Sequence, residues 1–265
     1  MQRFEIGQEV FARPDKDRIG TFAEYLAVNE NDLALKPAGL SMAEAASLPL
    51  VALTAWQALV ERANLQPGQK VLIHAGAGGV GVVAIQLAKH LGARVATTVS
   101  GGNVELVRKL GADVVIDYRT QDFTKVLGGY DVVLDSLGVN SVLASLTVLR
   151  EGGLVIGIAG PPDPEFADYL GKPILRPVLA LTSRKVRAAA KKLGVRYSFL
   201  FMRADGHQLA QISALVDAGV IRPHLDRTFD FADTLAAVEY VDSGQASGKV
   251  VVTMSPDAVR KPWRS

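Results

Sequence analysis

Val71-Leu72-Ile73-His74-Ala75-Gly76-Ala77-Gly78-Gly79-Val80-Gly81 is the stretch that decides the fold of this chain of 265 residues. Its apolar beginning predicts a buried strand of a parallel sheet, and its glycines predict a tight turn. The residues after it predict a helix, because apolar side chains recur there at helical spacing: Val83, Ala84, Leu87, Ala88 and Leu91. Strand, glycine turn and helix therefore follow one another directly.

Three glycines of this turn match the pattern G-x-G-x-x-G, at Gly76, Gly78 and Gly81. In this pattern the first glycine permits the turn, the second lets a pyrophosphate approach the backbone, and the third lets helix and strand pack closely. The start of the helix adds free N–H groups and the positive end of the helix dipole. Because the flanking strand and helix are those the pattern requires, we predict a dinucleotide-binding site here.

The residues after the second expected strand indicate which dinucleotide binds. Sites that prefer NAD usually carry an acidic residue there, which bonds the ribose hydroxyls. No Asp or Glu occurs between Arg62 and Val104, and the strand at 94–99 runs into Ser100-Gly101-Gly102-Asn103. Small polar groups of this kind can donate hydrogen bonds to a 2′-phosphate, which favours NADP(H). The alternative interpretation is an ordinary polar loop.

Composition and charge exclude several classes of protein. Hydrophobic residues make up 49% of the chain and charged residues 21%, as in ordinary globular proteins. The net charge of +2 gives no basic stripe for a nucleic acid. The absence of cysteine excludes disulfides, a cysteine nucleophile and thiolate zinc ligands. No signal peptide or membrane-spanning run is recognisable, so we expect a cytoplasmic protein without membrane association.

Alternating strands and helices predict an α/β fold with a doubly wound parallel sheet. Its strands are expected near residues 70–74, 94–99, 114–117, 131–135, 154–159 and 197–202. An insertion at 161–192 ends in a basic helix at 183–192, which is either a phosphate or partner surface or a solvated helix face.

Shorter elements are expected at both ends of the chain. Residues 9–12 and 21–28 predict strands, and Ser41 with Glu44 predicts a capped helix that ends at Pro49. The later elements are helices at 53–63, 207–218 and 232–241 and a strand at 248–253. We expect this last strand to pair with the N-terminal strands.

Four stretches together resemble the medium-chain dehydrogenase/reductase superfamily, in its zinc-independent quinone oxidoreductase branch. They are Gly20-Thr21-Phe22-Ala23-Glu24-Tyr25, Ala45-Ala46-Ser47-Leu48-Pro49-Leu50 with Leu53-Thr54-Ala55-Trp56, the turn Ala75-x-x-Gly78-x-x-Gly81, and Gly248-Lys249-Val250-Val251. The resemblance implies a Rossmann domain at 51–203 and a partial GroES-like β-barrel domain formed by 1–50 and 204–265. Compared with the family, the N-terminal part of the GroES-like domain is expected to be missing.

The resemblance also implies a cofactor site for NADPH between the two domains. The pyrophosphate would lie on the glycine turn, at Gly76, Gly78, Gly79, Val80 and Gly81. The adenosine ribose and its 2′-phosphate would lie near Ser100, Asn103 and Tyr118, although a tyrosine at this place is also an ordinary packing residue. The nicotinamide would be lined by Thr54, Ile158, Ala159, Gly160, Phe201 and Met202.

The activity implied by the resemblance is hydride transfer from NADPH to a small molecule, either a quinone or an activated C=C bond of an α,β-unsaturated carbonyl (enone or enal). No catalytic residue is identified. The Tyr25 hydroxyl has the chemistry of a proton donor, and the alternative interpretation of Tyr25 is a strand residue of the β-domain. The resemblance further implies a homodimer that pairs the strand near 197–202 across a two-fold axis.

Other functions fit the residues less well. Zinc alcohol dehydrogenases need cysteine ligands, and His74, His90, His207 and His224 show no ligand spacing. Short-chain reductases need Tyr-x-x-x-Lys, which does not occur, and methyltransferases normally need the missing acidic residue. A non-catalytic NADPH-binding or interaction protein remains the alternative from a different class.

Overall fold

The computed structural model describes residues 3–17 and 20–254. These residues form two compact units. One unit is built from both ends of the chain, Met1–Leu53 and Arg203–Ser265, and the other is the continuous segment Thr54–Met202. We describe each unit by itself and call them the terminal unit and the central unit.

The central unit is built on a parallel sheet of six strands in the order β5-β4-β3-β6-β7-β8. The order reverses between β3 and β6, which makes the sheet doubly wound. Its strands are β3 (Lys70–Ile73), β4 (Arg94–Val99), β5 (Val114–Asp117), β6 (Tyr130–Asp135), β7 (Leu149–Gly157) and β8 (Arg196–Phe199). The predicted α/β fold class and its six strands are confirmed.

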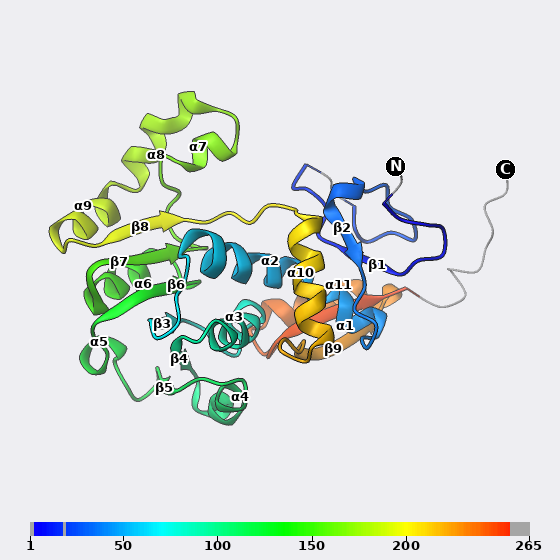
Figure 1. The fold of residues 1–265 in the computed structure, drawn as a ribbon, viewed down its shortest axis with the longest axis horizontal. Coiled ribbons are helices and arrows are strands. Elements are labelled where there is room, and N and C mark those ends of the chain that lie inside the picture. The colour runs from blue at the N-terminus through cyan, green and yellow to red at the C-terminus, as the bar shows by residue number, and fades with distance from the viewer. Residues whose placement is uncertain (1–2, 18–19, 255–265) are drawn as a thin grey trace. The chain divides into compact units, whose positions relative to one another are not determined.

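Helices cover both faces of this sheet, and Figure 1 shows α3 and α4 on one side of the strands and α5, α6 and α9 on the other. The central strands are therefore buried on both faces, and Val71, Leu72 and Ile73 are fully buried. The helices are α2 (Pro49–Trp56), which continues as a π-helical turn (Gln57–Arg62), α3 (Gly79–His90), α4 (Val104–Lys109), α5 (Phe123–Val126), α6 (Val139–Ser145), α7 (Phe166–Tyr169), α8 (Arg176–Thr182) and α9 (Arg184–Lys192).

The described residues of the terminal unit form two small sheets, and α1, α10 and α11 are the α-helices that lie wholly within it. Strands β1 (Val10–Ala12) and β2 (Leu33–Leu35) pair antiparallel, and β9 (Leu225–Asp230) and β10 (Lys249–Thr253) pair in parallel. Helix α1 (Met42–Ala46) starts with the predicted capping box, in which Ser41 and Glu44 each bond the backbone of the other. The other helices are α10 (Gly206–Asp217) and α11 (Thr234–Asp242).

Three predictions about the terminal unit are wrong. Residues 21–28 form no strand, and the large side chains Phe22 and Tyr25 are 59% and 56% exposed. Strand β10 pairs with β9 and not with the N-terminal strands, because α11 carries the chain back in the same direction between them. Pro49 begins α2 rather than ending the preceding helix, since proline suits the first helical turn.

None of the helices formed by the described residues combines the length and the apolar character that crossing a membrane would require.

Candidate functional site

The glycine turn lies directly between β3 and α3, at the carboxyl end of the central sheet. Ala75 opens the turn with φ at 52°, in the left-handed region. The N–H of Gly76 donates to the carbonyl of Thr98 on β4 at 3.0 Å, and the N–H of Gly78 donates to the carbonyl of Ala75 at 2.9 Å. Gly78 is the N-cap of α3, and its backbone is extended. The turn is thus tied to two neighbouring strands before the helix begins.

Packing requires two of the three glycines of the pattern. A Cβ at Gly76 would collide with the buried side chain of Thr97. A Cβ at Gly81 would lie 2.7 Å from the Cα of Gly76. Because the atoms it would meet belong to the backbone, no side-chain rotation could relieve this contact. A Cβ at Gly78 would approach the carbonyl of Ala75 to 3.2 Å, which is tight but tolerable. Packing therefore explains Gly76 and Gly81, whereas Gly78 leaves the helix N-terminus accessible.

The start of α3 can hold an anion. Gly79, Val80 and Gly81 are its first residues, and the first N–H groups of a helix lack a carbonyl four residues back. Gly79 and Val80 are partly exposed, and no acidic side chain lies in the first turn. Free N–H groups and the positive dipole end together fit a pyrophosphate.

Three polar residues predicted near the adenosine ribose lie together in the structure. The side chain of Asn103 donates to Ser100 Oγ at 3.2 Å, in the loop after β4. Tyr118 follows β5, its N–H donates to the carbonyl of Val99 at 3.1 Å, and its side chain is 59% exposed. Adjacent parallel strands end side by side, so this loop and Tyr118 form one edge of the candidate site.

An acidic residue that sequence reasoning missed lies at the same place. Asp117, the last residue of β5, is so close to the loop after β4 that a Cβ at Gly101 would lie 2.8 Å from its Oδ2. The acidic residue of NAD sites is expected at the end of the second strand, β4. Asp117 instead ends the third strand, β5, which the sheet places beside β4. Because the carboxylate of Asp117 lies at this place, the absence of Asp and Glu between Arg62 and Val104 favours NADP(H) less strongly than it would by itself.

The residues predicted near the nicotinamide follow two other strands at the same edge of the sheet. Ile158 donates its N–H to the carbonyl of Asp135 at 2.9 Å, which holds the start of the 158–160 loop beside the end of β6. Met202 is buried, and its carbonyl accepts from the Tyr169 hydroxyl at 3.5 Å. Phe201 is 40% exposed and packs against the rings of Phe166 and Tyr169.

Two other residues considered from sequence do not follow a strand of the central sheet. Thr54 lies on α2 with its side chain buried, and Tyr25 lies in the terminal unit.

A buried polar cluster beneath the glycine turn was not predicted. His74 is 2% exposed, its Nδ1 lies 3.0 Å from Thr98 Oγ1, and its Nε2 lies 2.9 Å from Ser145 Oγ. Ser145 Oγ in turn donates to Asp135 Oδ2 at 3.0 Å. Burial lowers the pKa of His74, and the carboxylate of Asp135 opposes this effect in part. No sequence signal could have found this cluster, because its members come from β4, β6, α6 and the residue that follows β3.

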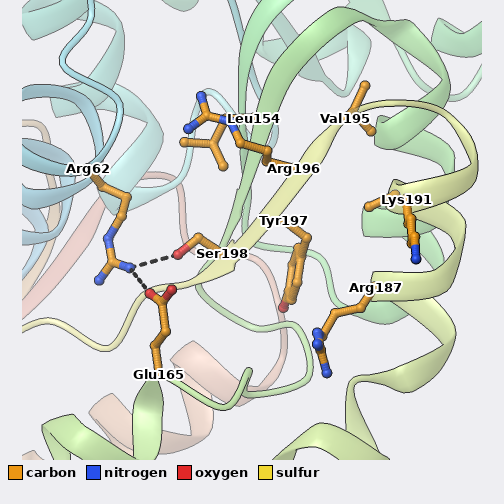
Figure 2. Close-up of a pocket in the computed structure, with 10 residues that line it drawn as sticks. Arg62, Leu154, Glu165, Arg187, Lys191, Val195, Arg196, Tyr197 and Ser198 are labelled. Atoms are coloured by element: carbon orange, nitrogen blue, oxygen red, sulfur yellow. Dashed lines mark hydrogen bonds and ion pairs between the residues drawn. The ribbon is translucent and has the colours of Figure 1, made fainter.

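The basic insertion contributes to a second concave region, beside β8. Figure 2 shows Arg62 pointing toward Ser198 and Glu165, with distances of 2.8 Å and 3.3 Å from its Nη1 to their oxygens. Arg187 and Lys191 of α9 also line this cavity of about 460 Å³. The cavity gathers more positive than negative side chains.

Among the residues that the structure describes, no group of three or more His, Cys, Asp or Glu side chains is arranged to hold a metal ion.

A doubly wound sheet with a glycine turn and helix N-terminus at its carboxyl edge defines a Rossmann-type α/β protein. Residues 110–252 match the family described as zinc-binding dehydrogenase. The chain belongs to this family and, with it, to the medium-chain dehydrogenase/reductase superfamily, as the resemblance predicted.

Three of the proteins to which the chain is similar are oxidoreductases by name. The chain is 37% identical over 263 residues to the mitochondrial NAD(P)H oxidoreductase RTN4IP1 of Mus musculus, covering 95% of this chain and 65% of that protein. It is 34% identical over 260 residues to the chloroplastic NADPH-dependent alkenal/one oxidoreductase of Arabidopsis thaliana, covering 94% and 58%. The quinone oxidoreductase structure from Coxiella burnetii superposes with a TM-score of 0.81 at 31% identity, over 95% of this chain and 73% of that one. The chain thus spans about two thirds of the length of the mouse relative.

Proposed function

We propose that this protein binds NADPH and transfers a hydride to a quinone or to the activated C=C bond of an enone or enal, without zinc. The observation that carries the proposal is the accessible N-terminus of α3, which follows a glycine turn at the carboxyl edge of a doubly wound sheet. Relatives named as NAD(P)H oxidoreductase and as NADPH-dependent alkenal/one oxidoreductase support the same chemistry.

In this proposal, each strand end contributes a part of the cofactor site. The amides of Gly79 and Val80 bind the pyrophosphate, and Ser100 with Tyr118 donates hydrogen bonds to the 2′-phosphate. The loop 158–160 and the backbone at Phe201 orient the nicotinamide. Bound NADPH supplies the hydride, so the protein's task is to align donor and acceptor and to exclude water.

No side chain of the chain is assigned as a general acid. Burial raises the pKa of Tyr197, whose hydroxyl donates to the carbonyl of Pro161 at 2.8 Å, so this phenol is held in a structural bond. We propose that backbone amides stabilise the negative charge that develops on the acceptor oxygen and that the final proton comes from water.

A non-catalytic NADPH-binding protein is the second candidate. The match covers 65% of the mouse oxidoreductase, so the relative's catalytic activity is a proposal for this chain and not a consequence of the match. Both candidates require the same cofactor site, and therefore binding of NADPH cannot separate them.

Turnover with a quinone separates the two candidates. We expect the loss of NADPH absorbance to accelerate when a simple quinone is added, at a rate that a metal chelator leaves unchanged, because the chain has no cysteine for a thiolate zinc site. Retained NADPH binding without turnover would instead support the binding protein, and loss of turnover with the chelator would contradict zinc independence.

The acidic residue beside the ribose loop gives a prediction about the cofactor. We expect Asp117→Asn to raise the ratio of NADPH affinity to NADH affinity by about threefold, because it removes a negative charge near the proposed 2′-phosphate. Titration calorimetry with both cofactors measures this ratio, and NADH serves as the internal control for damage to the fold. An unchanged ratio would mean that Asp117 lies away from the 2′-phosphate, and tighter binding of NADH than NADPH to the native chain would contradict the choice of cofactor.

A homodimer through residues 197–202 also remains a proposal. β8 is an edge strand of the sheet, which supports it, although the N–H of Phe199 already donates to Asp163 Oδ2 at 2.8 Å. Light scattering at micromolar concentration should give the mass of two chains, and the mass of one chain would exclude this arrangement.

We further propose a cytoplasmic location, although the mouse relative is named as mitochondrial. Fractionation of cells that express the native gene tests this.

A further inference from the structure

A continuous chain of hydrogen bonds connects a buried carboxylate to the first residue of the glycine turn. Asp135 Oδ2 accepts from Ser145, and Ser145 Oγ lies 2.9 Å from Nε2 of His74. On the other side of the ring, Nδ1 lies 3.0 Å from Thr98 Oγ1, and this oxygen accepts from the N–H of Ala75 at 3.3 Å. We call these four side chains, Asp135, Ser145, His74 and Thr98, the buried relay.

The direction of each hydrogen bond in the buried relay follows from the number of protons available. Ser145 has one hydroxyl proton and gives it to Asp135, so its oxygen must accept from Nε2–H of His74. Nδ1 then carries the lone pair and accepts the hydroxyl proton of Thr98. The oxygen of Thr98 keeps lone pairs for the N–H of Ala75. These directions are those of a neutral His74 with its proton on Nε2, whereas a protonated ring would instead donate from Nδ1 to Thr98 Oγ1.

The surroundings of His74 favour this neutral form. Asp135 on β6 is the charged group that faces the ring, whereas Thr98 on β4, Phe123 on α5 and Ser145 on α6 are uncharged. The net effect of burial and of Asp135 is a lowered pKa for His74, so the ring is neutral at pH 7.

Ala75 is the residue that needs support. Its φ of 52° is in the left-handed region, which costs a non-glycine residue roughly 1 kcal/mol or more. This conformation orients the Ala75 carbonyl, which accepts from the N–H of Gly78 at 2.9 Å and lies closest to the empty side-chain position of Gly78. The conformation of Ala75 thus determines how the turn enters α3.

We infer that the buried relay is a positioning device, which holds Ala75 in its left-handed conformation and so keeps the amides at the start of α3 in place for a pyrophosphate. His74 touches no ligand in this inference and acts through Thr98. The inference rests on the proposed function, because it takes the glycine turn to be the dinucleotide site.

A matched pair of serines tests the inference in the full chain. Ser145 and Ser183 are both fully buried, but the Ser183 hydroxyl donates to the carbonyl of Leu179 and lies outside the relay. The probe is ADP-ribose, which carries the pyrophosphate and lacks a titrating 2′-phosphate. We expect Ser145→Ala to weaken its binding about fivefold and Thr98→Val about tenfold, whereas Ser183→Ala leaves binding unchanged. Titration calorimetry measures all three.

Three further readouts exclude a merely structural role. Amide-hydrogen exchange should accelerate at residues 74–82 in Thr98→Val but not in Ser183→Ala. His74→Asn, whose amide oxygen can accept from Thr98, should bind ADP-ribose more tightly than His74→Leu. The native affinity should stay constant from about pH 8.5 to 7.5, because the pKa of His74 is lowered by burial and its ring stays neutral over this range.

The outcomes distinguish this inference from the proposed function. Equal ADP-ribose affinity and equal exchange in Ser145→Ala, Thr98→Val and Ser183→Ala would overturn the inference while leaving the dinucleotide site intact. A native chain that binds no ADP-ribose would instead contradict the proposed function, and faster exchange of the turn in Thr98→Val would then still support the relay, while unchanged exchange would overturn it.

Discussion

Replacing Gly78 with aspartate should abolish NADPH binding, with a loss in affinity of at least about 100-fold. Gly78 is the N-cap of α3, with an extended backbone, and aspartate is a preferred N-cap residue. The helix should therefore still form. The new carboxylate would occupy the position in which we place the pyrophosphate, and like charges at such a short distance repel strongly. Calorimetry with NADPH measures the loss, and quinone-dependent turnover should disappear with it.

Gly128→Asp is the matched control for this prediction. It introduces the same charge in the same unit, where a Cβ would meet nothing within 4 Å. We expect NADPH to bind this variant as it binds the native chain. If Gly78→Asp also retained its NADPH affinity, the pyrophosphate would not lie on the glycine turn, and the proposed cofactor site would have to be abandoned.

Gly206→Ala should destabilise the terminal unit by about 3 kcal/mol. Gly206 is the first residue of α10, and a Cβ there would lie 2.6 Å from the carbonyl oxygen of Asn31 and 2.9 Å from the N of Leu33. Both atoms belong to backbone, so no side-chain rotation can relieve the contact. Two hydrogen bonds hold α10 at this distance from the N-terminal segment: Ser213 Oγ donates to the carbonyl of Leu35 at 3.1 Å, and Asp217 accepts from Ala38 N–H at 3.0 Å.

Urea unfolding followed by circular dichroism measures this effect, with Gly39→Ala as the control. A Cβ at Gly39 would meet nothing within 4 Å, so the control should change stability by less than about 0.5 kcal/mol. If both variants unfolded at the native midpoint, the close approach of α10 to residues 31–33 would not exist in solution.

The central unit was predictable because its signals are local. The central strands β3 and β6 contain short apolar runs, and the end of α4 is marked by Lys109 and Gly111. Parallel strands that alternate with helices allow few arrangements, so the order of elements alone indicated a doubly wound sheet. The carboxyl edge of such a sheet then gathers the ends of the strands, which is why Ser100 and Tyr118 could be placed together in advance.

The terminal unit was less predictable because its elements depend on distant partners. The apolar residues at 21–28 satisfied the pattern of a strand, yet no strand in the part of the chain that the structure describes pairs with them, and Phe22 remains exposed. Strand β10 could have paired with any strand of its unit, and the connection through α11 decided in favour of β9. Which strands pair depends on residues that are far apart in the sequence, so a local pattern does not predict the pairing.

The sequence by itself therefore determined the α/β class, the glycine turn and the expectation of a dinucleotide site, since backbone freedom and apolar spacing are properties of neighbouring residues. Tertiary structure alone decided two features of the site, the carboxylate of Asp117 beside Gly101 and the buried relay from Asp135 to Ala75. The physical reason is distance along the chain: Asp135 lies 60 positions after Ala75 in sequence, and only the sheet brings the ends of β3, β4 and β6 side by side.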